Sequence, residues 1–301
     1  MECWYAAHRT VPGPVNIQIV HACQRAGQGG SPTAVLDDEP SLGDAERCAV
    51  PRAAGTSHAA FISSAEGLVS VRFFTAEGEL PACGHGTVAA LAVLAERAGA
   101  RRYETMLRAG GRTFPGKATG GDGRYEAVFD PGPVELDVPG PAEREQVLAA
   151  LGLDPGACSA SGNPDRTECR IASVGRPRML VRVADRQVLA ELAPDLPGLR
   201  AACDRLGLLG CYAYSSPSPD GRASARMFAP SIGVPEDIAN ANSTACLAAH
   251  LAGDGVAAVT VGMGDSLGRP STITASTRPG PAGPLVRVGG AATIAPVVSG
   301  C

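Results

Sequence analysis

The sequence predicts an α+β protein built from two similar lobes. With 301 residues, of which 45% are hydrophobic, the chain can fill a core in each of two medium-sized domains. Its 38 Gly and 25 Pro, beside an aromatic content of only 4%, indicate many short elements joined by tight turns. A long-range internal repeat indicates that the two lobes share one design.

Short strands separated by turns account for most of the first half. Turn residues and β-branched or aromatic runs predict strands at residues 15–22, 33–36, 59–63 and 68–74. The last two form a hairpin around a Ser-Ala-Glu-Gly turn, and a helix is expected at residues 42–50. The stretch RFFTAEGELPACGHGTVAALAVLAERAG then passes from a strand through a polar loop and a Gly-His-Gly turn into a helix that ends near Gly99.

A stretch rich in Pro and Gly, DPGPVELDVPGP at residues 130–141, marks the boundary between the lobes. We expect an N-terminal lobe at residues 1–130 and a C-terminal lobe at residues 131–301, with a terminal strand able to cross between them. The second half predicts helices at residues 141–153 and 186–192. Its predicted strands are residues 169–174, 179–183 and 210–214.

The two halves repeat one pattern. RMFAPSIGVPEDIANANSTACLAAHLAGDG again runs from a strand through a polar loop and a small-residue turn into a helix. Residues 72–75 (RFFT) align with residues 226–229 (RMFA), and an acidic loop follows each. If the lobes pack face to face, the strand-to-helix turns meet across a cleft to which both helix N-termini present backbone N–H groups.

Candidate catalytic groups lie in these two turns. A site that stabilises negative charge with helix N-termini needs titratable groups to move protons. One turn contains His85 and Cys83, and the other contains Asp237 and Glu236. We expect a histidine between two glycines at a helix start to be exposed, which favours function over capping. Cys83 is equally consistent with a reactive thiol and an inert one, while the position of Asp237 in the repeat favours function over a simple helix cap.

Composition excludes several classes of protein and partner. The net charge is -4 and no run of Lys or Arg occurs, so nucleic acid is not an expected partner. Residues 88–95, the longest apolar stretch, are too few to span a membrane, and a cytoplasmic protein is expected. Ten cysteines without CxxC pairs are typical of reduced thiols. Five histidines without HxxxH or HxH spacing predict no metal site.

The repeated segments resemble the motifs of the PhzF-like family, RFFTPxxExxLCGHATLAA and MFxPxxGxxEDPATGSA. Here they read RFFTAEGELPACGHGTVAA and RMFAPSIGVPEDIANANSTA. SPTAVLDD at residues 31–38 and LGRPS at residues 267–271 add supporting matches. The resemblance implies a diaminopimelate-epimerase-like fold, in which each lobe is a curved, mostly antiparallel sheet around a central helix. It also implies no cofactor, and proton transfer on a small substrate that carries a carboxylate.

By matched position, the resemblance places His85 and Asp237 among the catalytic residues. The family's principal acid/base, a glutamate in a SETAF-like segment, is replaced by His58 in TSHAAF. A histidine still exchanges protons at neutral pH, so we count His58 as catalytic. ANANSTA stands in place of PATGSA, so contacts to the substrate should differ there. The expected substrate-binding residues are Cys83, Gly84, Gly86, Ala241, Asn242 and Ser243.

Several functions fit these residues. The sequence is similar to a PhzF-like subgroup that serves 4-alkylproline building blocks of antibiotics such as lincomycin and the pyrrolobenzodiazepines, and that is held to hydrolyse a C–C bond and release oxalate. In that interpretation His58 activates water, and His85 or Asp237 protonates the departing carbon. The first alternative is the family's isomerisation along a conjugated system, and the second is a metabolite-binding protein without catalysis. Racemisation by two thiols is disfavoured, because Ala239 aligns with Cys83. The oligomeric state stays open, with a homodimer as one option.

Overall fold

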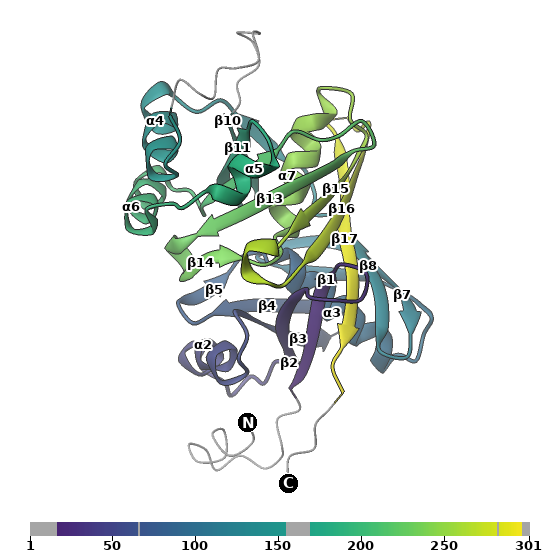
Figure 1. Cartoon of the computed structure of the whole chain (residues 1–301). Helices are drawn as coiled ribbons and strands as arrows, with labels where there is room; N and C mark the ends of the chain where they lie inside the picture. Colours follow the sequence, from purple (N-terminus) through teal and green to yellow (C-terminus); the bar gives the residue numbers. More distant parts are fainter. Residues whose placement is uncertain (1–16, 66, 155–168, 282, 297–301) are drawn as a thin grey trace. The chain divides into compact units, whose positions relative to one another are not determined.

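The computed structural model describes residues 17–65, 67–154, 169–281 and 283–296 (Figure 1). The chain divides into two compact units. Unit 1 contains the chain up to Phe129 together with the chain from Gly290 onward, and unit 2 runs from Asp130 to Gly289. The last strand, β17 (Leu285–Ile294), therefore passes from unit 2 into unit 1.

Unit 1 is a sheet that encloses a helix. Its strands are β1 (Gln18–Gln24), β2 (Ser31–Asp37), β3 (His58–Ala65), β4 (Leu68–Thr75), β5 (Gly78–Leu80), β6 (Arg102–Ala109), β7 (Arg112–Gly121) and β8 (Arg124–Phe129). Strand β17 pairs with both β1 and β8, which closes the sheet on itself. Helix α3 (Gly84–Arg97) contacts most of these strands, and its residues 84–95 are all buried. A second helix, α2 (Asp44–Ala53), packs against β3 and β4.

Unit 2 also has strands packed against a central helix, and it carries additional helices on its sheet. Its strands are β9 (Glu135–Asp137), β10 (Cys169–Val174), β11 (Arg176–Val183), β12 (Cys211–Ser215), β13 (Arg222–Ala229), β14 (Val234–Asp237), β15 (Ala258–Met263) and β16 (Ser271–Arg278). Its central helix, α7 (Ala241–Ala252), packs against β10, β11, β15 and β16 and is buried along most of its length. Helices α4 (Pro141–Ala150), α5 (Arg186–Glu191) and α6 (Leu196–Leu206) cover a second apolar core on the sheet, and the short helices are η2 (Pro230–Ile232) and η3 (Asp265–Leu267).

Strand pairing shows that the two units are duplicates. In unit 1, β2 and β3 are parallel across α2, and β4 and β6 are parallel across α3. In unit 2, β11 and β12 are parallel across α5 and α6, and β13 and β15 are parallel across α7. The other pairings of these strands are antiparallel, since hairpins join neighbours and only helical crossovers join parallel strands. The predicted α+β fold of two pseudo-symmetric lobes is confirmed.

An arginine–glutamate pair recurs at the same place in each unit. Arg72 on β4 donates to both carboxylate oxygens of Glu79 on β5, at 2.8 and 2.7 Å. Arg226 on β13 donates to both oxygens of Glu236 on β14, at 2.9 and 2.8 Å. Each pair clamps the short strand that leads toward the central helix, so the aligned arginines of the internal repeat have one structural role.

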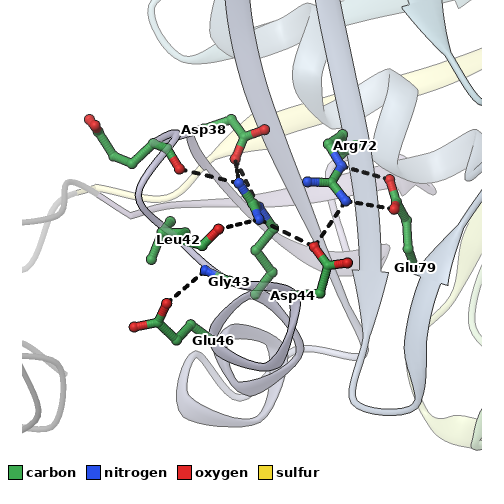
Figure 2. A network of polar contacts seen from close by, with 9 residues as sticks. Asp38, Leu42, Gly43, Asp44, Glu46, Arg72 and Glu79 are labelled. Carbon is green, nitrogen blue, oxygen red and sulfur yellow. Dashed lines mark hydrogen bonds and ion pairs between the residues drawn. The ribbon is translucent and has the colours of Figure 1, made fainter.

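A polar network holds α2 against the sheet of unit 1 (Figure 2). The buried Arg47 of α2 donates from Nη2 to Asp38 Oδ1 at 2.6 Å and from Nη1 to the carbonyl of Leu42 at 2.5 Å. Asp44 accepts from Arg47 at 3.3 Å and from Arg72 at 3.0 Å. Figure 2 shows Asp38, Asp44 and Arg72 gathered near the start of α2. The network ties α2 to β4 and to the loop after β2. Helix α2 also contacts β3, whose first residue is His58.

Most elements predicted from local sequence are present, with shifted ends. Strands β1 to β4 and helices α2, α3, α4 and α5 lie where they were predicted, although residues 15 and 16 of the first predicted strand lie outside the described residues. No element was predicted at residues 102–129, which form β6, β7 and β8, at α6, or at the strands β5, β9, β14, β15 and β16. Strand β7 contains Pro115 and several glycines, which are poor strand formers, so its sequence is typical of a turn. None of the described helices is both long and apolar enough to span a membrane.

Candidate active site

Three side chains with lone-pair donors converge in unit 1. His58, Cys83 and His85 are 2%, 5% and 1% exposed, so all three are withdrawn from solvent. One nitrogen of each imidazole and the Cys83 sulfur lie within 4.8 Å of one another. The two imidazole rings meet edge to face with their centroids 4.4 Å apart. Residues that are distant in the sequence therefore form one cluster, and it includes the position where the glutamate of the family motif is replaced.

His58 is placed by the start of strand β3. That strand pairs in parallel with β2, with His58 opposite Thr33, and the alternation of the strand turns the imidazole into the interior of unit 1. Ser57 Oγ lies 2.9 Å from His58 Nδ1 and so fixes the orientation of the ring. Burial lowers the pKa of His58 well below its usual value of 6.5, and the neighbouring His85 lowers it further. His58 is therefore a neutral imidazole at neutral pH.

Cys83 and His85 are placed by the start of helix α3. Cys83 is the N-cap residue in an extended conformation, and its side chain makes no capping hydrogen bond. Its carbonyl accepts from the backbone N–H of Thr87 at 2.9 Å and from Thr87 Oγ1 at 2.8 Å. Its sulfur lies 3.5 Å from His85 Nε2. The first turn of α3 thus aims a thiol and an imidazole at the same place.

The prediction that His85 is exposed was wrong. Small neighbours on either side do not expose a side chain when the helix itself is enclosed by a sheet, and residues 84–95 of α3 are buried throughout. Gly86 shows how tight this region is, because a Cβ there would lie 2.9 Å from Phe73 Cδ1 and 3.0 Å from Cys83 Sγ. Gly84 is buried as well. At Gly86 the helix backbone therefore lies close to its surroundings.

The other predicted residues lie around the start of α7 in unit 2. Asp237 is 4% exposed and is the last residue of β14. The prediction had placed it in the turn that follows. Asn240 is the N-cap of α7, where its Oδ1 accepts from the backbone N–H of Ser243 at 2.9 Å and its Nδ2 donates to Asp237 Oδ2 at 2.9 Å. Ala241 and Asn242 are buried in the first turn. Asp237 is thereby tied to the helix start through one amide.

The cap positions correct the alignment of the repeat by one residue. Cys83 and Asn240 are both N-caps, and each carbonyl accepts from the threonine hydroxyl four residues later, Thr87 at 2.8 Å and Thr244 at 3.1 Å. Asn240, and not Ala239, is therefore the counterpart of Cys83. Racemisation by two thiols stays disfavoured, because the corrected counterpart, Asn240, also lacks a thiol.

A buried cation lies beside the first turns of α7. Arg178 on β11 is 1% exposed, and its Nη1 donates to Cys246 Sγ at 2.9 Å and to the carbonyl of Asn242 at 3.5 Å. Burial raises the pKa of Cys246, while the adjacent guanidinium opposes that rise. Tyr212, also buried, lies 2.9 Å from the hydroxyl of Thr244. The corresponding strand position in unit 1 holds the small residue Thr33.

Sequence reasoning missed three residues that position or charge these helix starts. Ser57 orients His58, Asn240 connects Asp237 to α7, and Arg178 brings a positive charge beside α7. An asparagine immediately before a helix is a recognisable N-cap signal, so the N-cap role of Asn240 could have been predicted from the sequence. The neighbours of Ser57 and Arg178 are set by strand pairing, and local sequence carries no signal for them.

The fold defines a class of protein. A duplicated α+β fold whose sheets enclose central helices is similar to the fold of epimerase-like proteins. A predicted epimerase from Pseudomonas aeruginosa aligns with a TM-score of 0.77 and 25% identity, covering 95% of this chain and 100% of that chain.

Within that class, the chain belongs to the phenazine biosynthesis-like family, PhzC-PhzF, whose model matches residues 21–297. An uncharacterized isomerase from Deinococcus radiodurans is 31% identical over 249 residues, which cover 76% of this chain and 76% of that protein. The trans-2,3-dihydro-3-hydroxyanthranilate isomerase of Pseudomonas fluorescens is 27% identical over 280 residues, which cover 91% of this chain and 94% of that protein.

These comparisons confirm the resemblance at the level of the family. They favour an isomerase, because the similar proteins carry isomerase names. The expected hydrolysis of a C–C bond in the 4-alkylproline subgroup receives no support from them. The roles of His58, His85 and Asp237, and the expected substrate contacts, stay predictions.

Proposed function

We propose that the chain is an isomerase that moves a proton between two carbons of a small conjugated substrate bearing a carboxylate. The observation that carries the proposal is the buried pair of imidazoles, His58 and His85, whose ring centroids are 4.4 Å apart. Two imidazoles held side by side away from water are suited to removing a proton at one carbon and returning it at another, because each ring has nitrogens that can accept or donate a proton. The isomerase names of the similar proteins support this reaction class.

His58 is the proposed base. Burial keeps its imidazole neutral, so a lone pair is present at neutral pH. If Nδ1–H donates to Ser57 Oγ, 2.9 Å away, the lone pair is on Nε2 and is directed away from Ser57. His58 Nε2 would take a proton from a carbon beside the conjugated system, and the electron pair of the broken C–H bond would delocalise toward the carboxylate. The substrate then carries negative charge, and His58 carries the proton.

The start of α3 is the proposed stabiliser of that charge. The N-cap side chain makes no capping hydrogen bond, and the first-turn N–H groups together with the helix dipole favour an anion. His85, the second residue of the helix, or protonated His58 would return the proton to a different carbon. Atoms balance, because the product is an isomer of the substrate. Asp237 as a further acid or base remains a prediction, which Asp237→Asn tests.

The test is turnover of conjugated cyclic amino acids, among them trans-2,3-dihydro-3-hydroxyanthranilate, in D₂O. We expect a product of unchanged mass apart from incorporated deuterium. His58→Gln and His85→Gln should each reduce kcat by about 10²–10⁴-fold, the usual contribution of an acid/base group. The matched control is His250→Gln, which changes a histidine near the end of α7, and it should retain activity.

Two other outcomes would replace the proposal. Two fragments with release of oxalate would indicate the C–C bond hydrolysis expected from the subgroup resemblance. Ligand binding without turnover, unchanged in His58→Ala, would indicate a metabolite-binding protein. Full activity of both His58→Gln and His85→Gln would also contradict the proposed roles of these imidazoles.

A further inference from the structure

We propose that His58, Cys83 and His85 form a binding site for one thiophilic divalent cation, with Zn²⁺ as the best match. The three potential ligand atoms lie within 4.8 Å of one another, and all three side chains are buried. Among the residues that the structure describes, this is the only group of three or more His, Cys, Asp or Glu side chains with that spacing. The sequence predicted no metal site, because histidine spacing along one element cannot reveal ligands that come from two elements.

The distances suit a tetrahedral ion. With Zn–S of about 2.3 Å and Zn–N of about 2.0–2.1 Å, a sulfur and a nitrogen on one tetrahedral Zn²⁺ lie about 3.5 Å apart. Cys83 Sγ and His85 Nε2 are already 3.5 Å apart. His58 approaches from β3, and its ring stands at 84° to that of His85, so its nitrogen reaches the pair from a different direction. Small side-chain adjustments would complete three corners of the tetrahedron.

The surroundings also resemble those of a metal site. A metal-binding histidine usually engages its other ring nitrogen in a hydrogen bond that fixes the ring. Ser57 Oγ lies 2.9 Å from His58 Nδ1, which leaves Nε2 as the ligand atom. On the other side, Thr87 holds the Cys83 carbonyl with two hydrogen bonds of 2.8 and 2.9 Å. Both elements that supply ligands are therefore anchored before any ion binds.

The donor set selects the kind of cation. Two imidazoles and one thiolate favour Zn²⁺ and related transition metals, whereas Mg²⁺ and Ca²⁺ prefer oxygen ligands. The positive end of the α3 dipole opposes a cation, but the negative charge of the Cys83 thiolate offsets it. Three protein ligands leave a fourth position for water, as in zinc sites that are open to small molecules.

Metal binding has a consequence for catalysis that depends on the proposed function. An ion on the nitrogen lone pairs of His58 and His85 prevents these imidazoles from accepting protons. Zn²⁺ is then a reversible inhibitor, and chelators restore activity. The binding site itself does not depend on the proposed reaction.

Direct titration of the full chain tests the site without using activity. Chelator-treated protein is titrated with Zn²⁺ against a chromophoric competing chelator, and we expect one ion per chain. Cys83→Ser should weaken binding by about 100-fold or more, since loss of even a second-layer partner weakens metal sites by about 10–100-fold. The matched control is Cys48→Ser, which changes a half-buried thiol on α2 and should bind like the unchanged chain.

Cobalt provides a measurement that needs no variant to fold. Co²⁺ added to the unchanged chain should give a thiolate-to-metal charge-transfer band with the visible absorption of a tetrahedral site. Absence of stoichiometric Zn²⁺ binding, absence of the band, or equal affinity in Cys83→Ser would overturn the site. Failure to bind metal leaves the isomerase proposal intact, while tight binding in a chain without isomerase activity supports the metal site and removes the proposed function.

Discussion

Replacement of Gly86 by alanine tests whether tight packing holds the thiol and the imidazole of α3 in place. The added Cβ would lie 2.9 Å from Phe73 Cδ1, 3.0 Å from Phe73 Cε1 and 3.0 Å from Cys83 Sγ. Carbon atoms in good contact are about 3.5–4.0 Å apart, so the ring, the thiol or the helix must move by about 0.5–1 Å. The change therefore affects Cys83 without removing any polar group.

The expected size follows from two opposing effects. Alanine stabilises a helix interior by about 1 kcal/mol relative to glycine. Overpacking of a filled core costs about 1–3 kcal/mol. Because Phe73 is itself buried and cannot swing into solvent, we expect the second effect to win, with a net loss of about 1 kcal/mol in the free energy of unfolding. Displacement of the reacting groups should also lower kcat by roughly 10–10²-fold.

Urea unfolding followed by circular dichroism measures the stability, and D₂O turnover measures the activity. The control is Gly121→Ala on β7, where a Cβ would have no neighbour within 4 Å. That variant should match the unchanged chain in both measurements. If Gly86→Ala proves as stable and as active as the unchanged chain, the start of α3 is not tightly packed and the reasoning fails.

Three further predictions follow from charges inside the units. Arg226→Ala should lower the free energy of unfolding by more than Arg72→Ala does, by up to about 3 kcal/mol against about 1 kcal/mol or less. The side chains of the Arg226 pair are mostly withdrawn from solvent, at 13% and 11% exposed, whereas those of the Arg72 pair are 33% and 41% exposed. Equal losses in urea unfolding would contradict this. Arg178→Met should leave the free energy of unfolding unchanged or raise it by about 1–4 kcal/mol, because the buried Arg178 has no carboxylate partner among the described residues. A decrease of more than about 1 kcal/mol would show that the guanidinium is stabilising. Burial holds the pKa of His58 and that of His250 below 6.5 in the folded chain, so the unfolded chain binds more protons and stability should fall as the pH drops below 6.5. Urea unfolding of chelator-treated protein at about pH 7.5 and about pH 5.5 measures the fall, which should be smaller in His58→Gln, and a rise in stability at the lower pH would refute the sign.

The fold was largely predictable because the internal repeat can be recognised from short segments of the sequence. RFFT and RMFA occupy equivalent strands, and each arginine binds a glutamate on the next short strand. Several strands were not predicted. Three of them, β6 to β8, include Pro115 and several glycines, and they are strands because their neighbours pair with them. Local propensity is a weak guide where strand pairing supplies the hydrogen bonds.

The candidate site was only partly predictable. The motif match placed His58 and His85 among the expected catalytic residues, but no spacing rule related the two imidazoles to each other or to Cys83. Their proximity depends on β3 and on the start of α3 within the same closed sheet. The prediction of an exposed His85 failed for the same reason, since exposure depends on what surrounds a helix and not on the residues beside it in the chain.

The sequence by itself determined the duplicated α+β design, the family, and which residue types stand at the two helix starts. These are properties of order along the chain, which periodicity, turn residues and motifs record directly. Only the tertiary structure decided that an imidazole at the beginning of β3 meets a thiol and a second imidazole at the beginning of α3. It also decided that all three are buried deeply enough for His58 to stay neutral. The physical reason is that both proximity and desolvation arise from strands and helices packing together, and neither is encoded by neighbours in the chain.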